Sequence, residues 1–111
     1  MCPCGGNPVT ADHAADLRTA ADRLEQLAGR TTGGDWRLAG LLATRPEVIA
    51  HASDGGTEHV AEARARTGEW IAALSPDLAA PIAAWLRAAA DAEPVDAAAA
   101  AVARLLLHRL P

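Results

Sequence analysis

The segment from Trp70 to Leu86 decides the fold; it reads Trp-Ile-Ala-Ala-Leu-Ser-Pro-Asp-Leu-Ala-Ala-Pro-Ile-Ala-Ala-Trp-Leu and carries two of the three Trp residues of the chain. Ser75 is a favourable N-cap, and Pro76 suits the first position of a helix, where a missing N–H costs nothing. Asp77 adds a negative charge at the positive end of that helix. We therefore expect a helical hairpin, in which one helix ends near Leu74 and the next begins at once.

The composition is that of one small folded domain. The chain has 111 residues, of which 50% are hydrophobic, and this is enough to bury a core. It has no Phe and no Tyr, so the core must be built from aliphatic residues and the three Trp. Because truncation of a buried Trp typically costs about 3–5 kcal/mol, we expect Trp36, Trp70 and Trp85 to have structural roles.

The N-terminal part predicts a tail followed by a helix. Residues 1–9 combine Pro and Gly with little to bury and are interpreted as a flexible tail, so the single domain is expected to span residues 10–111. Thr10 is the expected cap, and Gly29 is expected to end the helix in a left-handed conformation. The apolar residues recur at spacings of three and four, which predicts one buried stripe. These residues are Leu17, Ala20, Ala21, Leu24, Leu27 and Ala28.

The middle of the chain favours strands. Three short apolar runs are separated by turn-rich breaks at residues 44–46 and 53–56, which predicts a three-stranded antiparallel meander over about 36–42, 47–52 and 57–61. An all-helical bundle is the alternative, because this segment is also rich in Ala.

Turn lengths decide which residues of the meander share a face. With even-length turns, which we favour, His51 pairs with Glu58 and His59 points the other way, whereas an odd-length turn places His51 opposite His59. The favoured register groups one face as Trp36, Leu38, Ile49 and Val60. The outer face would then be half polar, and it is either a contact surface or covered by another helix. Its residues are Arg37, Ala39, Leu41, Val48 and His59.

From Glu62 onward the pattern is helical. Pro81 is expected to bend the helix after Ser75, and Glu93-Pro94 is expected to open the last helix. We therefore predict an α+β fold with an N-terminal helix, the meander, and three C-terminal helices packed on one face of the sheet.

The order of these features resembles small proteins of actinobacteria and their phages, similar to the Ead/Ea22-like phage family. The matching motifs are the turn at residues 32–36, the helix and break at residues 70–76, and the segment from Ile82 to Leu86, so the resemblance covers about residues 27–90. The chain departs from the family pattern before Trp36, where Gly-Gly-Asp stands in place of Pro-Gly-Pro, and also at Trp70 and Pro81. The resemblance implies an α+β shape and no established activity or site.

Cys2-Pro3-Cys4 is the candidate metal or redox motif. Structural zinc takes four S or N ligands, and with only two Cys in the chain the set would have to be completed by histidines. The candidates are His13, His51, His59 and His108. A mobile tail with reactive thiols, a strained disulfide or a crosslink between chains are the other interpretations.

A hydrolase-like site around His51 is a further hypothesis. Glu58 or Asp54 could orient the imidazole, and Ser53 or Thr57 could act as nucleophile, but Ser, Asp and Thr are also expected in a Gly-rich turn for backbone reasons. Two other groups are interpreted as structural: the Gly pairs at 33–34 and 55–56 as turns, and Asp12, Asp16 and Asp22 as part of a solvated helix face.

Charge and hydropathy limit the partners. With a net charge of −4 and scattered Arg residues, nucleic-acid binding is not expected, and no apolar run reaches the roughly 18 residues of a membrane span. A cytoplasmic location is expected, where the Cys residues would stay reduced. We assign no residue as catalytic, cofactor-binding or metal-binding. The function we expect is that of a small non-enzymatic interaction or accessory protein with an unidentified protein partner or a homodimer; the alternative is a metal-binding or redox module using Cys2 and Cys4.

Overall fold

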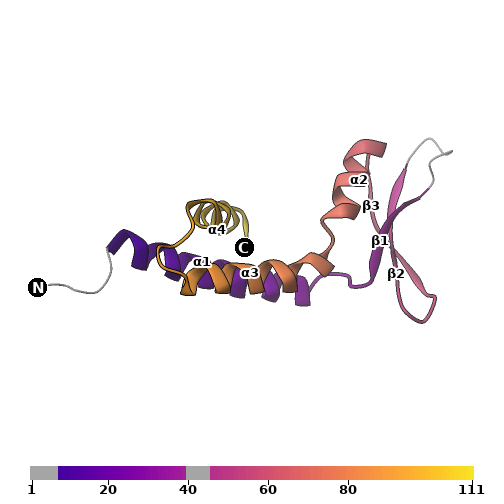
Figure 1. Cartoon of the computed structure of the whole chain (residues 1–111). Helices are drawn as coiled ribbons and strands as arrows, with labels where there is room; N and C mark the ends of the chain where they lie inside the picture. Colours follow the sequence, from indigo (N-terminus) through magenta and orange to yellow (C-terminus); the bar gives the residue numbers. More distant parts are fainter. Residues whose placement is uncertain (1–7, 40–45) are drawn as a thin grey trace, which may run out of the picture. The chain divides into compact units, whose positions relative to one another are not determined.

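The structure is a computed structural model that describes residues 8–39 and 46–111 (Figure 1). It has an N-terminal helix, a three-stranded antiparallel sheet and then helices, which confirms the predicted α+β class and rules out the all-helical alternative. The elements are α1 (Pro8–Gly29), β1 (Asp35–Ala39), β2 (Glu47–His51), β3 (Thr57–Glu62), α2 (Ala65–Ala73), the 3-10 turn η1 (Pro76–Leu78), α3 (Ala79–Asp91) and α4 (Ala97–Arg109).

The chain divides into two compact units. The sheet unit spans Ala28–Ala79, and the helical unit combines Met1–Leu27 with Ala80–Pro111. Most of the predicted tail, residues 1–7, lies outside the described residues, but α1 already begins at Pro8, so the expectation that Thr10 caps it is wrong. α1 ends at Gly29 as expected but without a left-handed residue there, since positive φ is confined to Gly34 and Gly55 among the described residues.

The strands lie in the order β1-β2-β3, with Trp36 opposite Ala50 and Leu38 opposite Val48. The expected face is therefore corrected: Trp36 and Leu38 lie on the side of Val48 and Ala50, and Ile49 lies on the other side. Two features change the register from the one expected. The turn between the paired residues His51 and Thr57 has an odd number of residues, and an irregularity between Val48 and Ile49 shifts the pairing of β2 with β3 by one more residue.

One helix, α2, packs on this sheet within the sheet unit. Val48 and Ala50 are buried on the face that α2 covers. The approach is so close that a Cβ on Gly68 would lie 2.5 Å from Leu38 Cδ1. Glycine in a helix interior costs about 1 kcal/mol relative to Ala, and here its lack of a side chain lets the helix reach the sheet.

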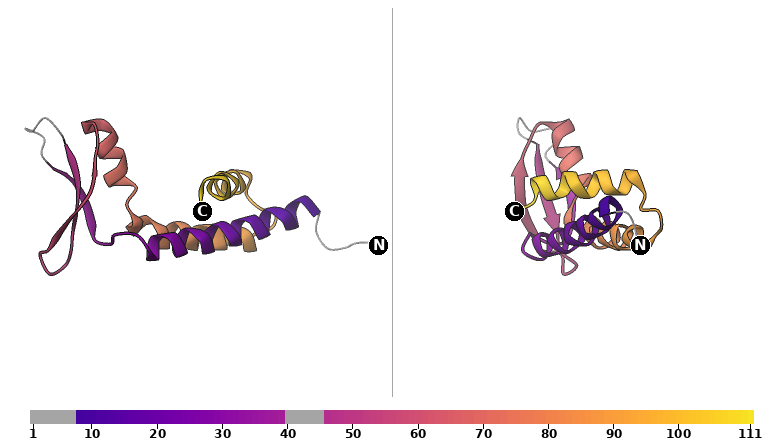
Figure 2. Two further views of the ribbon diagram at one scale, coloured as in Figure 1. Left: turned by 180° about the vertical axis from the view of Figure 1, so that it is seen from behind. Right: turned by 90° about the vertical axis from the view of Figure 1, so that its left-hand side faces the viewer.

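The buried residues of α3 and α4 form a core with α1, and the expectation that these two helices pack on the sheet stays a prediction. In the helical unit α1 and α3 lie side by side and antiparallel, and α4 crosses them steeply (Figures 1 and 2). Six of the eight core residues are Ala, which lets helix backbones approach closely. The core consists of Leu17, Ala20, Ala21, Ala83, Leu86, Ala90, Ala99 and Ala103.

Ion pairs join α1 to α3 along the outside of this core. Arg18 Nη2 lies 2.7 Å from Asp91 Oδ1, and Arg87 Nη2 lies 2.8 Å from Asp22 Oδ1 and 2.5 Å from Glu25 Oε1. The hydrogen bonds to Asp22 and Glu25 raise the pKa of the Arg87 guanidinium above its ordinary value, so its charge is maintained. These antiparallel pairs fix which turn of α3 lies beside which turn of α1.

The helix starts differ from the predictions in three places. Ser75 precedes the turn η1 and makes no side-chain capping bond, and α3 begins only after that turn. Pro81 is the third residue of α3, where an N–H has no partner within that helix, so Pro81 removes no helical hydrogen bond and gives no cause for the expected bend. The last helix begins not at Glu93-Pro94 but after Asp96, whose carboxylate accepts the Ala99 N–H at 2.9 Å.

The three Trp residues are not among the buried core residues, in contrast to the expectation from composition. Trp36 is half-buried and donates its indole N–H to the Thr32 carbonyl at 3.1 Å. Trp70 is 68% exposed and Trp85 is 45% exposed. Trp85 lies beside the buried stripe of α3, which runs through Ala83, Leu86 and Ala90.

Replacement of Gly34 by Ala tests the backbone that leads into β1. Gly34 has a φ of +92°, and a Cβ there would lie 2.8 Å from the His51 carbonyl oxygen, so Gly34→Ala is expected to destabilise the sheet unit by about 1–3 kcal/mol. Gly55→Ala, at φ +90° in open space, isolates the conformational cost, and Gly33→Ala in open space is the neutral control. Hydrogen exchange of the β1 and β2 amides measures the stability of the sheet unit in the three variants. Equal losses of stability in Gly33→Ala and Gly34→Ala would contradict the prediction.

Two Leu residues of the helical unit form a matched test of its core. Leu86 is fully buried and Leu105 is 52% exposed, so Leu86→Ala is expected to cost about 2–5 kcal/mol and Leu105→Ala less than about 1 kcal/mol. The free energy of unfolding of α1, α3 and α4, obtained from hydrogen exchange, measures the difference. Comparable losses in the two variants would show that the Ala-rich cluster is not the core.

Candidate functional site

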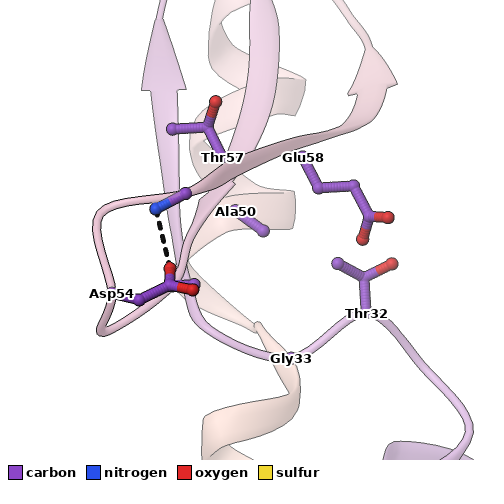
Figure 3. A pocket seen from close by; sticks show the side chains of 8 residues that line it. Thr32, Gly33, Ala50, Asp54, Thr57 and Glu58 are labelled. Carbon is purple, nitrogen blue, oxygen red and sulfur yellow. Dashed lines mark hydrogen bonds between the residues drawn. The ribbon is translucent and has the colours of Figure 1, made fainter.

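A pocket opens at one end of the sheet unit, between the loop before β1 and the turn that joins β2 to β3 (Figure 3). Its volume is about 430 Å³, and the side chains of Thr32 and Glu58 point toward one another across it. Asp54 Oδ1 accepts the Gly56 N–H at 2.8 Å, which is a turn-forming role. The lining offers carboxylate and hydroxyl oxygens and contains no imidazole or thiol. It consists of Thr32, Gly33, Ala50, Ala52, Asp54, Gly56, Thr57 and Glu58.

The groups of the hydrolase hypothesis do not converge on this pocket. His51 lies opposite Thr57, whereas Glu58 lies opposite Ala50. Because successive residues of a strand point to opposite faces, Glu58 and His51 lie on opposite faces of the sheet. The expected His51–Glu58 pair is therefore wrong, and Asp54, the other candidate carboxylate, holds the turn by accepting the Gly56 N–H.

The sheet face opposite α2 mixes polar and apolar residues, since Ala39 and Ile49 lie on it beside polar groups that contact one another. His59 Nδ1 lies 2.9 Å from Glu47 Oε2, and Arg37 donates from Nε to Asp35 Oδ2 at 2.7 Å. Val48, expected on this face, is fully buried on the other one. Leu41, also expected here, lies outside the described residues. Arg37, Ala39 and His59 thus lie on this face as predicted, and Ile49 takes the place expected for Val48.

The candidate metal ligands lie on different elements of the two units. His13 in α1 accepts a hydrogen bond from Arg104 of α4 at 3.3 Å, whereas His51 and His59 lie in the sheet unit and His108 lies in the last turn of α4. Within residues 8–39 and 46–111 no group of three His, Cys, Asp or Glu could hold a metal ion. Cys2 and Cys4 lie outside the described residues, so the metal or redox hypothesis for Cys2-Pro3-Cys4 stays a prediction.

Among the described residues of the sheet unit, the large apolar side chains that are most exposed lie on the outer face of α2. Trp70 is 68% exposed and Leu74 is 51% exposed, and the two are four residues apart, so they are neighbours on the helix surface. Arg66 and Ala73 are exposed on the same side. We define the α2 outer face as Arg66, Trp70, Ala73 and Leu74.

The close contact at Gly68 determines this exposure. Gly68 is buried against Leu38, and two residues further along a helix the side chain has turned by about 200°. Trp70 must therefore point away from the sheet whenever Gly68 faces it. The helix presents its largest side chain to solvent because its smallest residue is needed on the inside.

No family model, curated protein or solved structure matches this chain. The resemblance to the Ead/Ea22-like phage family therefore stays a prediction. In the described part of the chain, no helix is both long enough and apolar enough to cross a membrane.

The sequence alone does not predict the α2 outer face, because its composition assigns Trp70 to the core. The feature of the sequence that could have indicated this face is Gly68, two positions before Trp70. Gly lowers the stability of a helix interior, so its presence there suggests a role in packing. A Gly in a helix interior indicates a close backbone approach, and the side chain half a turn away then points outward.

A larger side chain at Gly68 should disturb the packing of α2 on the sheet. Leu38 can rotate away from a single methyl group, but a Leu side chain at position 68 would occupy the space of Leu38 itself. Gly68→Leu is expected to destabilise α2 and β1 by about 1–3 kcal/mol. The control is Thr67→Leu, at an exposed position of the same helix, with an expected effect within about 0.5 kcal/mol. Hydrogen exchange of the α2 amides distinguishes them, and an unchanged α2 in Gly68→Leu would contradict the close packing.

Proposed function

We propose that this protein is a small non-enzymatic interaction protein that binds another protein through the α2 outer face. The observation that carries the proposal is the exposure of Trp70 together with Leu74 on the side of α2 opposite Gly68. Trp is enriched at protein interfaces, because its large ring adds contact area at a low cost in conformational entropy. Single exposed apolar residues are ordinary on protein surfaces, but an adjacent Trp and Leu form a continuous patch.

The local chemistry supports binding over catalysis. On the opposite sheet face, Arg37 forms an ion pair with Asp35, and His59 is hydrogen-bonded to Glu47. The pocket offers oxygen acceptors, of which Asp54 already holds its own turn. Neither place combines a nucleophile with an oriented base, which covalent catalysis requires.

The size of the patch indicates how the partner must bind. Full burial of one exposed large apolar side chain contributes about 1.5–3 kcal/mol, and because Trp70 and Leu74 are already partly covered, together they supply at most about 3–6 kcal/mol. The loss of translational and rotational freedom costs about 4–15 kcal/mol. A stable complex therefore needs further contacts around the patch, and we expect the partner to cover neighbouring polar residues as well.

Photocrosslinking from the patch tests this role. A photoreactive phenylalanine analogue is placed at Ala73, which is exposed beside Trp70 and Leu74, and the full chain is irradiated in the cells that naturally carry it. We expect a covalent protein adduct that falls at least about tenfold when Trp70→Gln is added, since about 1.4 kcal/mol of binding energy corresponds to a factor of ten.

The control places the same analogue at Thr57, an exposed residue of β3. Adducts at position 73 that match those at position 57, or that persist unchanged in Trp70→Gln, would overturn the proposed function.

A further inference from the structure

We infer that the partner of the α2 outer face is a second copy of this chain, packed with its α2 antiparallel to the first about a two-fold axis. This inference rests on the proposed function and adds the identity of the partner. A two-fold interface uses the same patch on both copies, so the patch must be complementary to itself.

Unpaired charges of opposite sign flank the patch along the chain. Arg64 and Arg66 lie at the N-terminal end of α2, and Asp77 follows its C-terminal end in η1. All three are exposed, and within the described residues none of them takes part in an ion pair. By contrast, Asp35 with Arg37 and Glu47 with His59 are paired in the same unit. Glu69, an exposed carboxylate of α2, lies one turn after Arg66, but Arg64 and Arg66 together outnumber it, so the N-terminal flank of the patch keeps a net positive charge opposite in sign to Asp77.

An antiparallel arrangement brings these opposite charges together. When two copies of α2 pack head to tail, the basic end of each helix lies beside the acidic end of its partner, at both ends of the interface. A parallel arrangement would place Arg66 beside Arg66 and Asp77 beside Asp77, and like charges in contact oppose binding. The charge distribution thus selects a second copy and also its orientation.

The apolar residues fit the same arrangement. Arg66, Trp70 and Leu74 follow one another at intervals of four residues and so form one ridge of the helix. In an antiparallel pair the two ridges place Trp70 and Leu74 of each copy at the centre and the Arg side chains at the rim. Each copy contributes its own Trp70 and Leu74, so a dimer buries twice the apolar surface of a single patch. This added burial supplies part of the further contacts that a stable complex needs.

The test is sedimentation of the purified full chain over protein concentrations from micromolar to millimolar, under reducing conditions so that Cys2 and Cys4 cannot crosslink chains. We expect a reversible monomer–dimer equilibrium. Trp70→Gln is expected to weaken dimerisation at least about tenfold, which corresponds to about 1.4 kcal/mol. Trp85→Gln, at an exposed Trp of the helical unit, is the matched control and should leave the equilibrium unchanged.

A charge exchange tests the orientation. Arg66→Glu and Asp77→Arg should each weaken the dimer several-fold, and the variant with both substitutions should recover most of the lost affinity, because opposite charges again meet across the axis. Arg23→Glu, at an exposed Arg of α1, controls for net charge. Hydrogen exchange of the sheet unit verifies that each variant is folded.

The outcomes separate this inference from the proposed function. A chain that stays monomeric at all concentrations, or a dimer insensitive to Trp70→Gln, overturns self-association through α2. A dimer that the double charge variant fails to restore overturns the antiparallel arrangement. If the chain is monomeric but the analogue at position 73 captures other proteins in a Trp70-dependent way, the proposed function stands and the second copy is excluded.

Discussion

The contact between Gly68 and Leu38 is the constraint on which the sheet unit depends. It brings α2 against β1 with no side chain between the helix backbone and Leu38, and it thereby fixes the rotation of the helix about its own axis. Once that rotation is fixed, Val48 and Ala50 are covered and Trp70 faces solvent. A glycine that weakens the helix in isolation thus determines both the burial of the sheet and the position of the binding surface.

The helical unit is held together in a different way. Its core is made mostly of methyl groups, so large side chains do not set the order of its helices. The ion pairs of Arg18 with Asp91 and of Arg87 with Asp22 supply alignment along the surface. Exposed pairs contribute little stability, but opposite charges at matching turns disfavour a shift of one helix along the other. Packing and charge therefore have separate roles: the Ala residues allow proximity, and the charges select the alignment.

The order and type of the elements could be predicted from the sequence, because Pro and Gly breaks and apolar periodicity are local signals. The strand register could not, since it depends on the turn shaped by the Asp54–Gly56 hydrogen bond and on an irregularity beside Val48. The packing of α3 and α4 with α1 could not be predicted either, because an apolar stripe shows which face is buried and not what covers it. The exposure of Trp70 depends on a contact between residues 38 and 68, and such a distant pairing leaves no periodic trace in the chain.

The alanine core of the helical unit has a consequence for the variation that this protein can tolerate. An alanine side chain has no rotamers, so residues such as Ala20, Ala83 and Ala103 cannot rearrange to admit a bulkier neighbour. Any increase in volume must be met by moving whole helices apart, which would also separate the guanidinium of Arg87 from its two carboxylates. Orthologous chains that keep this fold should therefore vary freely at its aliphatic rim while retaining only the smallest residues where the three helices meet.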